Sequence, residues 1–191
     1  YIQLVMKSVV GVNPKNGSIL WQSKWPGKVA VIPTPVYSDG SVYITPGYGV
    51  GCKRIEIGEN APKEVFENKV MKNHHGGVIK VKNHIYGYSD GVGWVCQDFK
   101  TGELVWNEKK ALGKGAIAYA DNHLYCQGEG EGKVILIEAT PTGWVPKGEF
   151  TINPQTKKRN PKGRIWTHPV ISNGKLYLRD QEYILCYDIK G

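Results

Sequence analysis

The sequence lacks several features that would place it in well-known classes. It has no run of about 18 apolar residues, which excludes a transmembrane helix. It has no C-x-x-C pair, no C-x-x-C-H haem-attachment motif and only four widely spaced cysteines, so neither a zinc site nor a dense disulfide framework is expected. It also lacks an initiator Met, a charged n-region and a cleavage site, and it starts inside an apolar, strand-like stretch at Tyr1. We therefore expect a piece of a longer chain.

Long helices are also disfavoured, because glycine and proline together are frequent. The 191 residues include 24 Gly and 11 Pro, a density of chain-breaking residues that suits short strands joined by turns. Hydrophobic residues make up 40% and charged residues 22%, with 11 Tyr and 6 Trp, which is enough apolar surface for a folded core. The composition predicts an all-β domain with a net charge of +8.

An internal repeat supports this fold class. Four segments share an apolar strand, a turn with Asp or Asn, and a second strand that carries an aliphatic-Tyr pair. They are residues 36–43 (VYSDGSVY), 78–86 (VIKVKNHIY), 117–125 (IAYADNHLY) and 170–177 (VISNGKLY). One supersecondary unit is thus repeated along the chain.

A second frame recurs at residues 10–21, 95–106 and 136–144 and in part at 185–191, and it reads D-x-x-T-G-x-x-x-W in its best copy, at Asp98, Gly102 and Trp106. An earlier copy ends at Trp21. In this frame the Asp accepts backbone N–H bonds within the turn, and Gly takes the positive-φ position. The Trp supplies a large flat group that can wedge between neighbouring sheets. We interpret these residues as a structural docking motif.

Four short strands in units of about 40 residues are typical of the four-stranded antiparallel blades of a β-propeller. The predicted units are a partial blade at 1–34, which holds the last two strands of a blade, blades at 35–70, 77–110 and 116–152, and an incomplete blade at 169–191. Because the segment begins and ends inside blades, we expect about four blades, an arc of a larger seven- or eight-bladed ring. A small self-contained array of sheets is the alternative.

The frame at residues 98–106 resembles the tryptophan-docking repeat of quinoprotein alcohol dehydrogenases and their non-catalytic relatives. Over its whole length the chain resembles the C-terminal half of a PQQ-like β-propeller repeat protein, a bacterial secreted family. The stretches that carry this resemblance are YIQLVMKSVVGV (1–12), IPTPV (32–36), GYGVGC (47–52), NHHGGV (73–78), YADNHLY (119–125) and WTHPVISNGKLYLRDQEYILCYD (166–188).

The resemblance implies a periplasmic or extracellular protein and two candidate functions. The first is a non-catalytic binding or scaffold module, with a protein partner or a small-molecule ligand in the funnel and with the remaining blades from the same or another chain. The second is a dehydrogenase of alcohols or sugars that uses pyrroloquinoline quinone (PQQ) with calcium. Catalytic relatives carry a pair of adjacent cysteines beside the quinone, and this sequence has none. The first function is therefore favoured, and no catalytic residue is predicted.

When the repeats are aligned on their tyrosines, the segments before each innermost strand come into register. Their side chains should converge at the mouth of the central channel. The resulting candidate ligand-binding residues are His74, His75, Lys114, Trp166 and His168. Imidazoles can relay protons or hold an anion near neutral pH, and a lysine between two glycines can donate to an anionic group.

A structural role is the alternative for this cluster, since His74 and His75 can cap strand ends and stack on neighbouring blades. Adjacent histidines point to opposite sides of an extended chain, so no metal site is predicted. Asn73, Arg179 and Asp180 are further candidates, although for Arg179 and Asp180 an ion pair that closes the hairpin is favoured over ligand binding.

Two other features have simpler interpretations. Cys52, Cys96 and Cys186 occupy nearly equivalent positions in three blades, too far apart to bridge, so we expect buried free thiols, whereas Cys126 lies in a different strand. Basic residues are concentrated at 157–164, in an expected exposed loop that is solvated or meets an anionic glycan, a lipid surface or an acidic partner. No nucleic-acid recognition module is visible.

Overall fold

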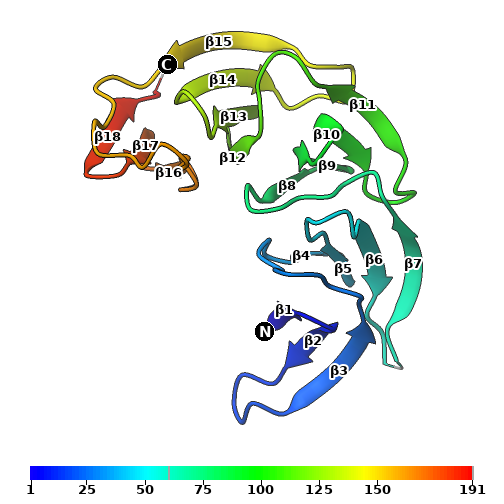
Figure 1. The fold of residues 1–191 in the computed structure, drawn as a ribbon. Coiled ribbons are helices and arrows are strands. Elements are labelled where there is room, and N and C mark those ends of the chain that lie inside the picture. The colour runs from blue at the N-terminus through cyan, green and yellow to red at the C-terminus, as the bar shows by residue number, and fades with distance from the viewer. Residues whose placement is uncertain (60, 191) are drawn as a thin grey trace.

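The computed structural model describes residues 1–59 and 61–190, which form five antiparallel sheets side by side in an arc (Figure 1). Sheet one contains β1 (Ile2–Val5), β2 (Ser8–Val12) and β3 (Ile19–Lys24). Sheet two contains β4 (Val36–Ser38), β5 (Ser41–Ile44), β6 (Cys52–Glu56) and β7 (Lys63–Asn68). Sheet three contains β8 (Val78–Val81), β9 (His84–Ser89), β10 (Gly93–Asp98) and β11 (Leu104–Glu108). Sheet four contains β12 (Gly115–Ala120), β13 (His123–Gly128), β14 (Lys133–Glu138) and β15 (Pro146–Thr151), and sheet five contains β16 (Val170–Ser172), β17 (Lys175–Asp180) and β18 (Tyr183–Asp188).

Within each sheet the strands are hydrogen-bonded in chain order, so every connection inside a sheet is a hairpin. The first strand of sheets two to five lies on the concave side of the arc, and the outer rim is formed by β3, β7, β11 and β15 (Figure 1). Propeller blades have this up-and-down order. The predicted all-β fold of four-stranded antiparallel sheets is confirmed. None of the described residues forms a helix long and apolar enough to cross a bilayer.

The first sheet differs from its prediction, because it holds three strands rather than two. The additional strand is β1, whose Val5 pairs with Ser8 across a turn formed by Met6 and Lys7. This turn has neither glycine nor Asp or Asn, so it lacks the signal that marks the other hairpins of the repeat. The hairpin at residues 6–7 therefore has no turn signal in the sequence.

The core lies between the sheets, where the inward side chains of neighbouring sheets interleave. One buried cluster joins sheets three and four through Trp94 and Cys96 on one side and Leu124, Cys126 and Ile137 on the other. The side chains of Tyr43 and Gln97 join sheets two and three, since the Tyr43 hydroxyl donates a 2.6 Å hydrogen bond to Gln97 Oε1. Burial of apolar area of this kind contributes roughly 25 cal/mol per Å² and is the main force holding the sheets together.

The docking motif fixes its own turn and, through Trp106, joins sheet three to sheet four. Asp98 Oδ1 accepts hydrogen bonds from the backbone N–H groups of Lys100 and Thr101, both at 2.8 Å. Although burial alone would raise the pKa of Asp98, these N–H groups hold it below its usual value. Gly102 has a φ of 77°, and Trp106 Nε1 donates to the carbonyl of Thr140 in the next sheet at 3.0 Å. Trp21 lies directly over Gly11 in sheet one.

All four cysteines are free thiols, and three of them, Cys52, Cys96 and Cys126, are buried. The expectation of a buried thiol is wrong for Cys186, which is exposed. Cys52 and Cys96 face the sheet that follows their own, whereas Cys186 lies in β18 of the last sheet of the arc, which has no following sheet in this chain. The cysteine at this repeat position is therefore buried where another sheet follows and exposed in the last sheet of the arc.

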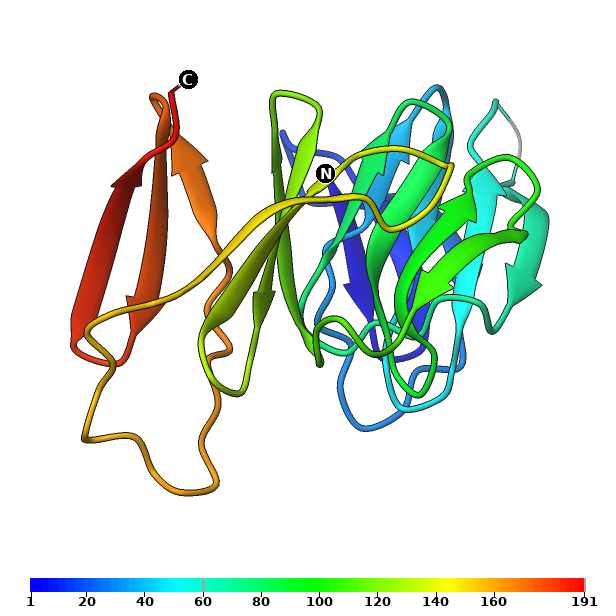
Figure 2. The same ribbon diagram turned by 90° about the horizontal axis from the view of Figure 1, so that it is seen from above.

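The strands of every sheet run between two opposite sides of the arc, which Figure 2 shows at its lower and upper edges. At the lower end the chain passes from the outermost strand of one sheet to the innermost strand of the next, and we call this the mouth end. Its loops are residues 6–7, 25–35, 45–51, 69–77, 90–92, 109–114, 129–132, 152–169 and 181–182. The opposite end carries the remaining hairpin turns. The connection between β15 and β16 projects furthest at the mouth end (Figure 2).

Candidate functional site

The connection between β7 and β8 is organised by the buried side chain of Asn73. Its Nδ2 donates to the carbonyls of Gly77 at 2.9 Å and Tyr88 at 3.0 Å, and its Oδ1 accepts from the Gly77 N–H at 3.0 Å. The backbone N–H of Asn73 donates to Thr45 Oγ1 in the neighbouring sheet. Asn73 was predicted as a ligand-binding candidate, and the structure gives it a full set of contacts within the protein.

Glycines allow the connections of adjacent sheets to approach closely. A Cβ on Gly76 would lie 1.9 Å from the carbonyl oxygen of Gly115, and one on Gly47 would lie 2.8 Å from the Cα of His74. Side chains larger than hydrogen would force these loops apart. The close approach brings residues from four sheets to one place beside the concave edge.

His74 lies in a polar chain that crosses from one sheet to the next. Its Nδ1 is 2.9 Å from Lys114 Nζ, which also forms an ion pair with Asp90 Oδ1 at 2.7 Å. The imidazole is packed edge-on against the ring of Tyr48, with ring centroids 4.7 Å apart. Lys114 is thus a charge held between an imidazole and a carboxylate, which fixes its position at the mouth end.

His75 lies next to the carboxylate of Glu129. Their Nε2 and Oε2 atoms are 3.0 Å apart, and the two side chains are only 11% and 20% exposed. Burial, followed by the nearby positive charge of Lys114, lowers the pKa of His75 to about 4. His75 is therefore neutral at pH 7. The two atoms are close but poorly aligned, and neither has a hydrogen-bond partner among the described residues.

His168 and Trp166 complete the cluster from the connection before β16. His168 Nε2 is 2.5 Å from the carbonyl oxygen of His75, and the Trp166 ring lies edge-on to His75 with centroids 6.1 Å apart. Trp166 is 59% exposed. A small hollow of about 150 Å³ lies beside them, and its lining includes His75, His168 and Ile32.

The five predicted residues His74, His75, Lys114, Trp166 and His168 therefore lie together. Their groups can donate and accept hydrogen bonds at close quarters, around a neutral imidazole, a carboxylate and a fixed ammonium. No group of three or more His, Cys, Asp or Glu side chains that could hold a metal ion is found in residues 1–59 and 61–190. The arrangement is suited to binding a polar group, with the exposed Trp166 as an apolar surface beside it.

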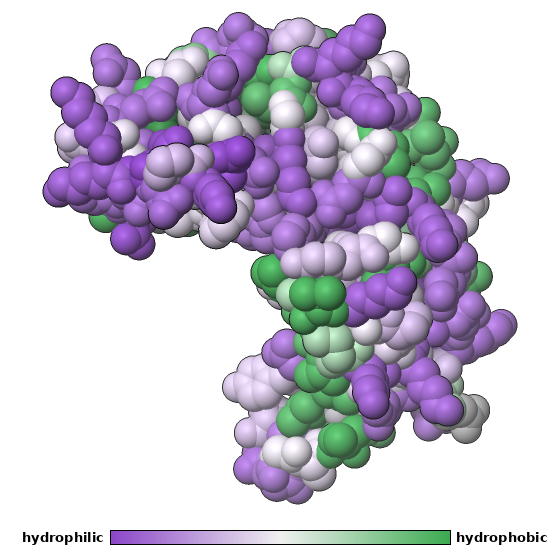
Figure 3. Space-filling model, viewed as in Figure 1, coloured by the Kyte–Doolittle hydropathy of each residue, from purple (hydrophilic) through white to green (hydrophobic). Residues whose placement is uncertain are grey.

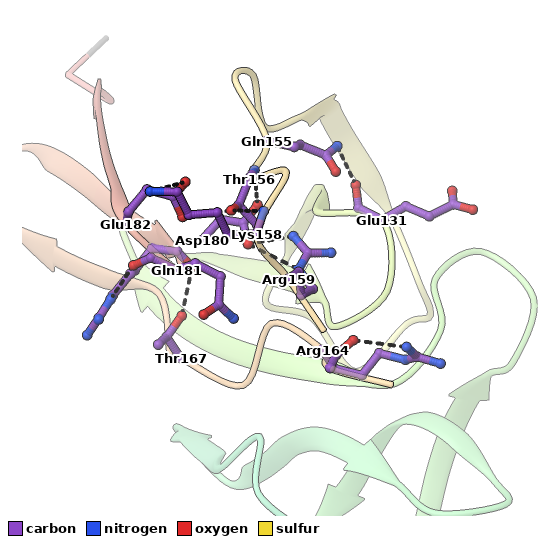
Figure 4. Close-up of polar contacts among 12 residues, drawn as sticks. Glu131, Gln155, Thr156, Lys158, Arg159, Arg164, Thr167, Asp180, Gln181 and Glu182 are labelled. Atoms are coloured by element: carbon purple, nitrogen blue, oxygen red, sulfur yellow. Dashed lines mark hydrogen bonds and ion pairs between the residues drawn. The ribbon is translucent and has the colours of Figure 1, made fainter. Parts of the chain in front are cut away.

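Arg179 and Asp180 lie apart from this cluster and do not pair with each other. Asp180 is 1% exposed and forms an ion pair with Arg159, with Arg159 Nη2 2.5 Å and Nε 3.2 Å from its Oδ1. Its Oδ2 accepts from the backbone N–H of Thr156 at 3.0 Å (Figure 4). Arg179 Nε donates to the carbonyl of Gln181 instead. The predicted ion pair of the hairpin is thus replaced by one with the basic loop, and Arg159 is a structural residue of that loop.

Reasoning from the sequence missed three members of the cluster, Tyr48, Asp90 and Glu129. The repeat held a signal for two of them, because Asp90 and Glu129 each follow their repeat tyrosine by four residues. That position lies in the turn between the second and third strands of a sheet, at the mouth end. Tyr48 was hidden in a stretch that reads as a tight glycine loop.

Comparison with solved structures supports the class of fold. The chain superimposes on BamB from Moraxella catarrhalis with a TM-score of 0.68 at 14% identity, covering 95% of this chain and 51% of that one. It superimposes on the computationally designed protein Ika8 with a TM-score of 0.66 at 11% identity, covering 98% of this chain and 57% of that one. This chain is therefore a β-propeller arc that spans about half the length of these two proteins.

The sequence gives the family. A family model described as outer membrane protein assembly factor BamB matches residues 5–190, so the chain belongs to this family of PQQ-like β-propeller repeat proteins. No significant match is found among functionally curated proteins. The resemblance expected from the repeats is confirmed.

Proposed function

We propose that this chain forms part of a non-catalytic, periplasmic or extracellular propeller that binds a ligand or protein partner at the mouth end. The proposed binding site is the cluster of His74, His75, Lys114, Trp166 and His168, together with Glu129. The rest of the ring is supplied by further blades, from the same or another chain. The name of the matched family, an assembly factor, is consistent with a propeller that works by binding.

The observation that carries this proposal is the contact between His75 and Glu129. Buried polar atoms in folded proteins are nearly always hydrogen-bonded, and an unpartnered one costs about 1–3 kcal/mol. Here His75 Nε2 and Glu129 Oε2 lie 3.0 Å apart but are too poorly aligned for a hydrogen bond, and neither atom has another hydrogen-bond partner among the described residues. Both atoms are buried, so a ligand group that both donates and accepts, such as a hydroxyl or an amide, satisfies them once the surrounding loops move to admit it.

The quinone-dependent function has no comparable support in this chain. The resemblance implies PQQ with calcium, which needs a set of carboxylate and amide oxygens around the ion. The described residues contain no such acidic cluster, and the four cysteines are too far apart in the sequence to form an adjacent pair. The residues present do not fit this cofactor, so no step through it is derived.

Site-specific photo-crosslinking in the intact protein tests the proposal. A photo-reactive amino acid at Trp166, which is exposed beside the cluster, should give a discrete adduct in the native cell. The same group at the exposed Lys82, in a turn of the opposite end, is the matched control and should give none. His75→Ala and Glu129→Gln should each weaken the adduct at Trp166.

Two results would contradict the proposal. Equal adducts at both positions would mean that the reaction is non-specific. Alcohol oxidation by the purified protein that depends on added PQQ and calcium would instead show a dehydrogenase.

A further inference from the structure

The excess positive charge of the chain is confined to one end of the arc. The mouth-end loops carry twelve basic and four acidic residues, a net charge of +8. The basic residues are Lys7, Lys28, Lys69, Lys72, Lys109, Lys110, Lys114, Lys157, Lys158, Arg159, Lys162 and Arg164; the acidic ones are Asp90, Glu129, Glu131 and Glu182. The loops of the opposite end are balanced, with four of each sign, as are the strands, with nine of each. The net positive charge is therefore concentrated at the mouth end, whereas the opposite end and the strands are neutral overall.

Most of this charge is available to a partner. Nine of the twelve basic side chains are exposed, and the internal ion pairs at this end involve Lys114, Arg159 and Lys158. The basic residues come from the connections between all five sheets, so they are spread along the whole arc. Figure 3, which views the arc from the mouth end, shows hydrophilic residues over most of this surface. The positive side chains repel one another, and contact with a broad anionic surface reduces this repulsion.

Exposed apolar side chains lie in the same loops. Val29 is 74% exposed, Trp166 59% and Ile32 51%, and Met6 and Tyr48 are also exposed. Outside the strands, the opposite end carries one large exposed hydrophobic residue among those that the structure describes, Tyr1 at 82%. Apolar side chains gather on the part of the face formed by the first two sheets (Figure 3).

We propose that the mouth end is a docking face for an anionic lipid surface. Clustered Lys and Arg residues attract the negative charge of acidic headgroups, and Trp, Tyr and aliphatic side chains insert at the boundary between headgroups and acyl chains. A bilayer matches positive charge that is distributed over an entire end of the molecule, whereas an acidic protein would match a local patch. This inference goes beyond the proposed ligand-binding site, because its main residues lie outside the cluster around His75. They are Lys109, Lys110 and residues 157–162.

Vesicle flotation of the intact protein tests this inference. The protein should float with phosphatidylcholine vesicles that contain phosphatidylglycerol, should not float with phosphatidylcholine alone, and should dissociate as salt is raised. The double substitution K109E/K110E should lower the partition coefficient at least about tenfold, since each basic residue near such a surface contributes about fivefold. The control K82E/K100E makes the same change of charge at exposed positions of the opposite end and should bind like the wild type.

The apolar contribution is tested separately. The double substitution V29S/I32S leaves the charge unchanged, and it should weaken binding to the phosphatidylglycerol vesicles at low salt. Equal binding to both kinds of vesicle, or equal losses for K109E/K110E and K82E/K100E, would overturn the proposal. Binding to soluble polyglutamate but not to vesicles would also overturn it, in favour of an acidic protein partner.

Discussion

Arg159 and Asp180 form an ion pair that joins the longest connection of the arc to the last residue of β17, the middle strand of sheet five. Arg159 Nη2 and Asp180 Oδ1 are 2.5 Å apart, and the two side chains are 16% and 1% exposed. Arg159 Nη1 also donates to the carbonyl of Gly130 in sheet four at 3.2 Å. One arginine therefore connects the basic loop to two sheets and holds it at the mouth end (Figure 4).

Arg159→Ala should destabilise the fold, because it leaves the Asp180 carboxylate buried without its charged partner. Losing one member of a buried pair costs about 3–5 kcal/mol. The double substitution R159M/D180L removes both charges and should recover most of this loss. Urea unfolding of the two variants measures the effect, with Lys162→Ala in the same loop as the control. An Arg159→Ala variant as stable as the control would show that the pair is not structural.

Two buried tryptophans differ in their hydrogen bonding and should respond differently to replacement by Phe. Trp94 Nε1 donates to the carbonyls of Leu112 and Gly113, both at 3.1 Å, whereas Trp25 Nε1 has no partner among the described residues. Both side chains are almost fully buried, so the loss of packing is similar. Trp94→Phe should therefore cost about 1–2 kcal/mol more than Trp25→Phe. Equal midpoints of chemical unfolding for the two variants would contradict this assignment.

The stability of the protein should fall as the pH drops from about 6.5 toward 4, through the titration of His75. Burial and the neighbouring positive charge of Lys114 lower the pKa of His75 to about 4, whereas an unfolded histidine titrates near 6.5. Within this window the unfolded chain takes up a proton that the folded protein excludes, so acid favours unfolding. His75→Gln should flatten the pH dependence of the denaturation midpoint between these values. An unchanged slope would mean that His75 titrates normally in the folded protein.

Native thiol labelling should separate Cys186 from the other three cysteines. Burial raises the pKa of the Cys96 thiol to about 12 and raises that of Cys126 well above its usual value, so neither is a reactive thiolate near neutral pH. Cys186 is exposed in this chain and should react first. In the intact ring, a blade packed on β18 would protect it. Comparing the 191-residue chain with the intact protein by mass spectrometry therefore shows whether a further blade covers this sheet.

The repeat made most of the fold predictable from the sequence. The tyrosine frames at Tyr43, Tyr86, Tyr125 and Tyr177 all lie in second strands, since turn residues and alternating apolar residues are local signals. The missed β1 lacked such a turn. Cys186 was misjudged because burial depends on the neighbouring sheet, which the local pattern does not contain.

The candidate site was only partly predictable. Aligning the repeats brought His74, His75, Lys114, Trp166 and His168 together, because equivalent loops of a cyclic repeat lie at one end of it. The carboxylates of Asp90 and Glu129 come from a different turn, and their contacts depend on packing between sheets. The partner of Asp180 was likewise set by the path of the 152–169 connection, which has no counterpart of that length in the other repeats.

The most direct test of the central claim compares stability and binding in Glu129→Gln. Residues of a binding site often reduce stability, so replacing the Glu129 carboxylate, whose buried Oε2 has no well-aligned hydrogen bond, should leave the free energy of unfolding unchanged or raise it. The same substitution should abolish the crosslinked adduct at Trp166. A variant that loses about 2 kcal/mol or more of stability while keeping the adduct would instead show that His75 and Glu129 only support the fold.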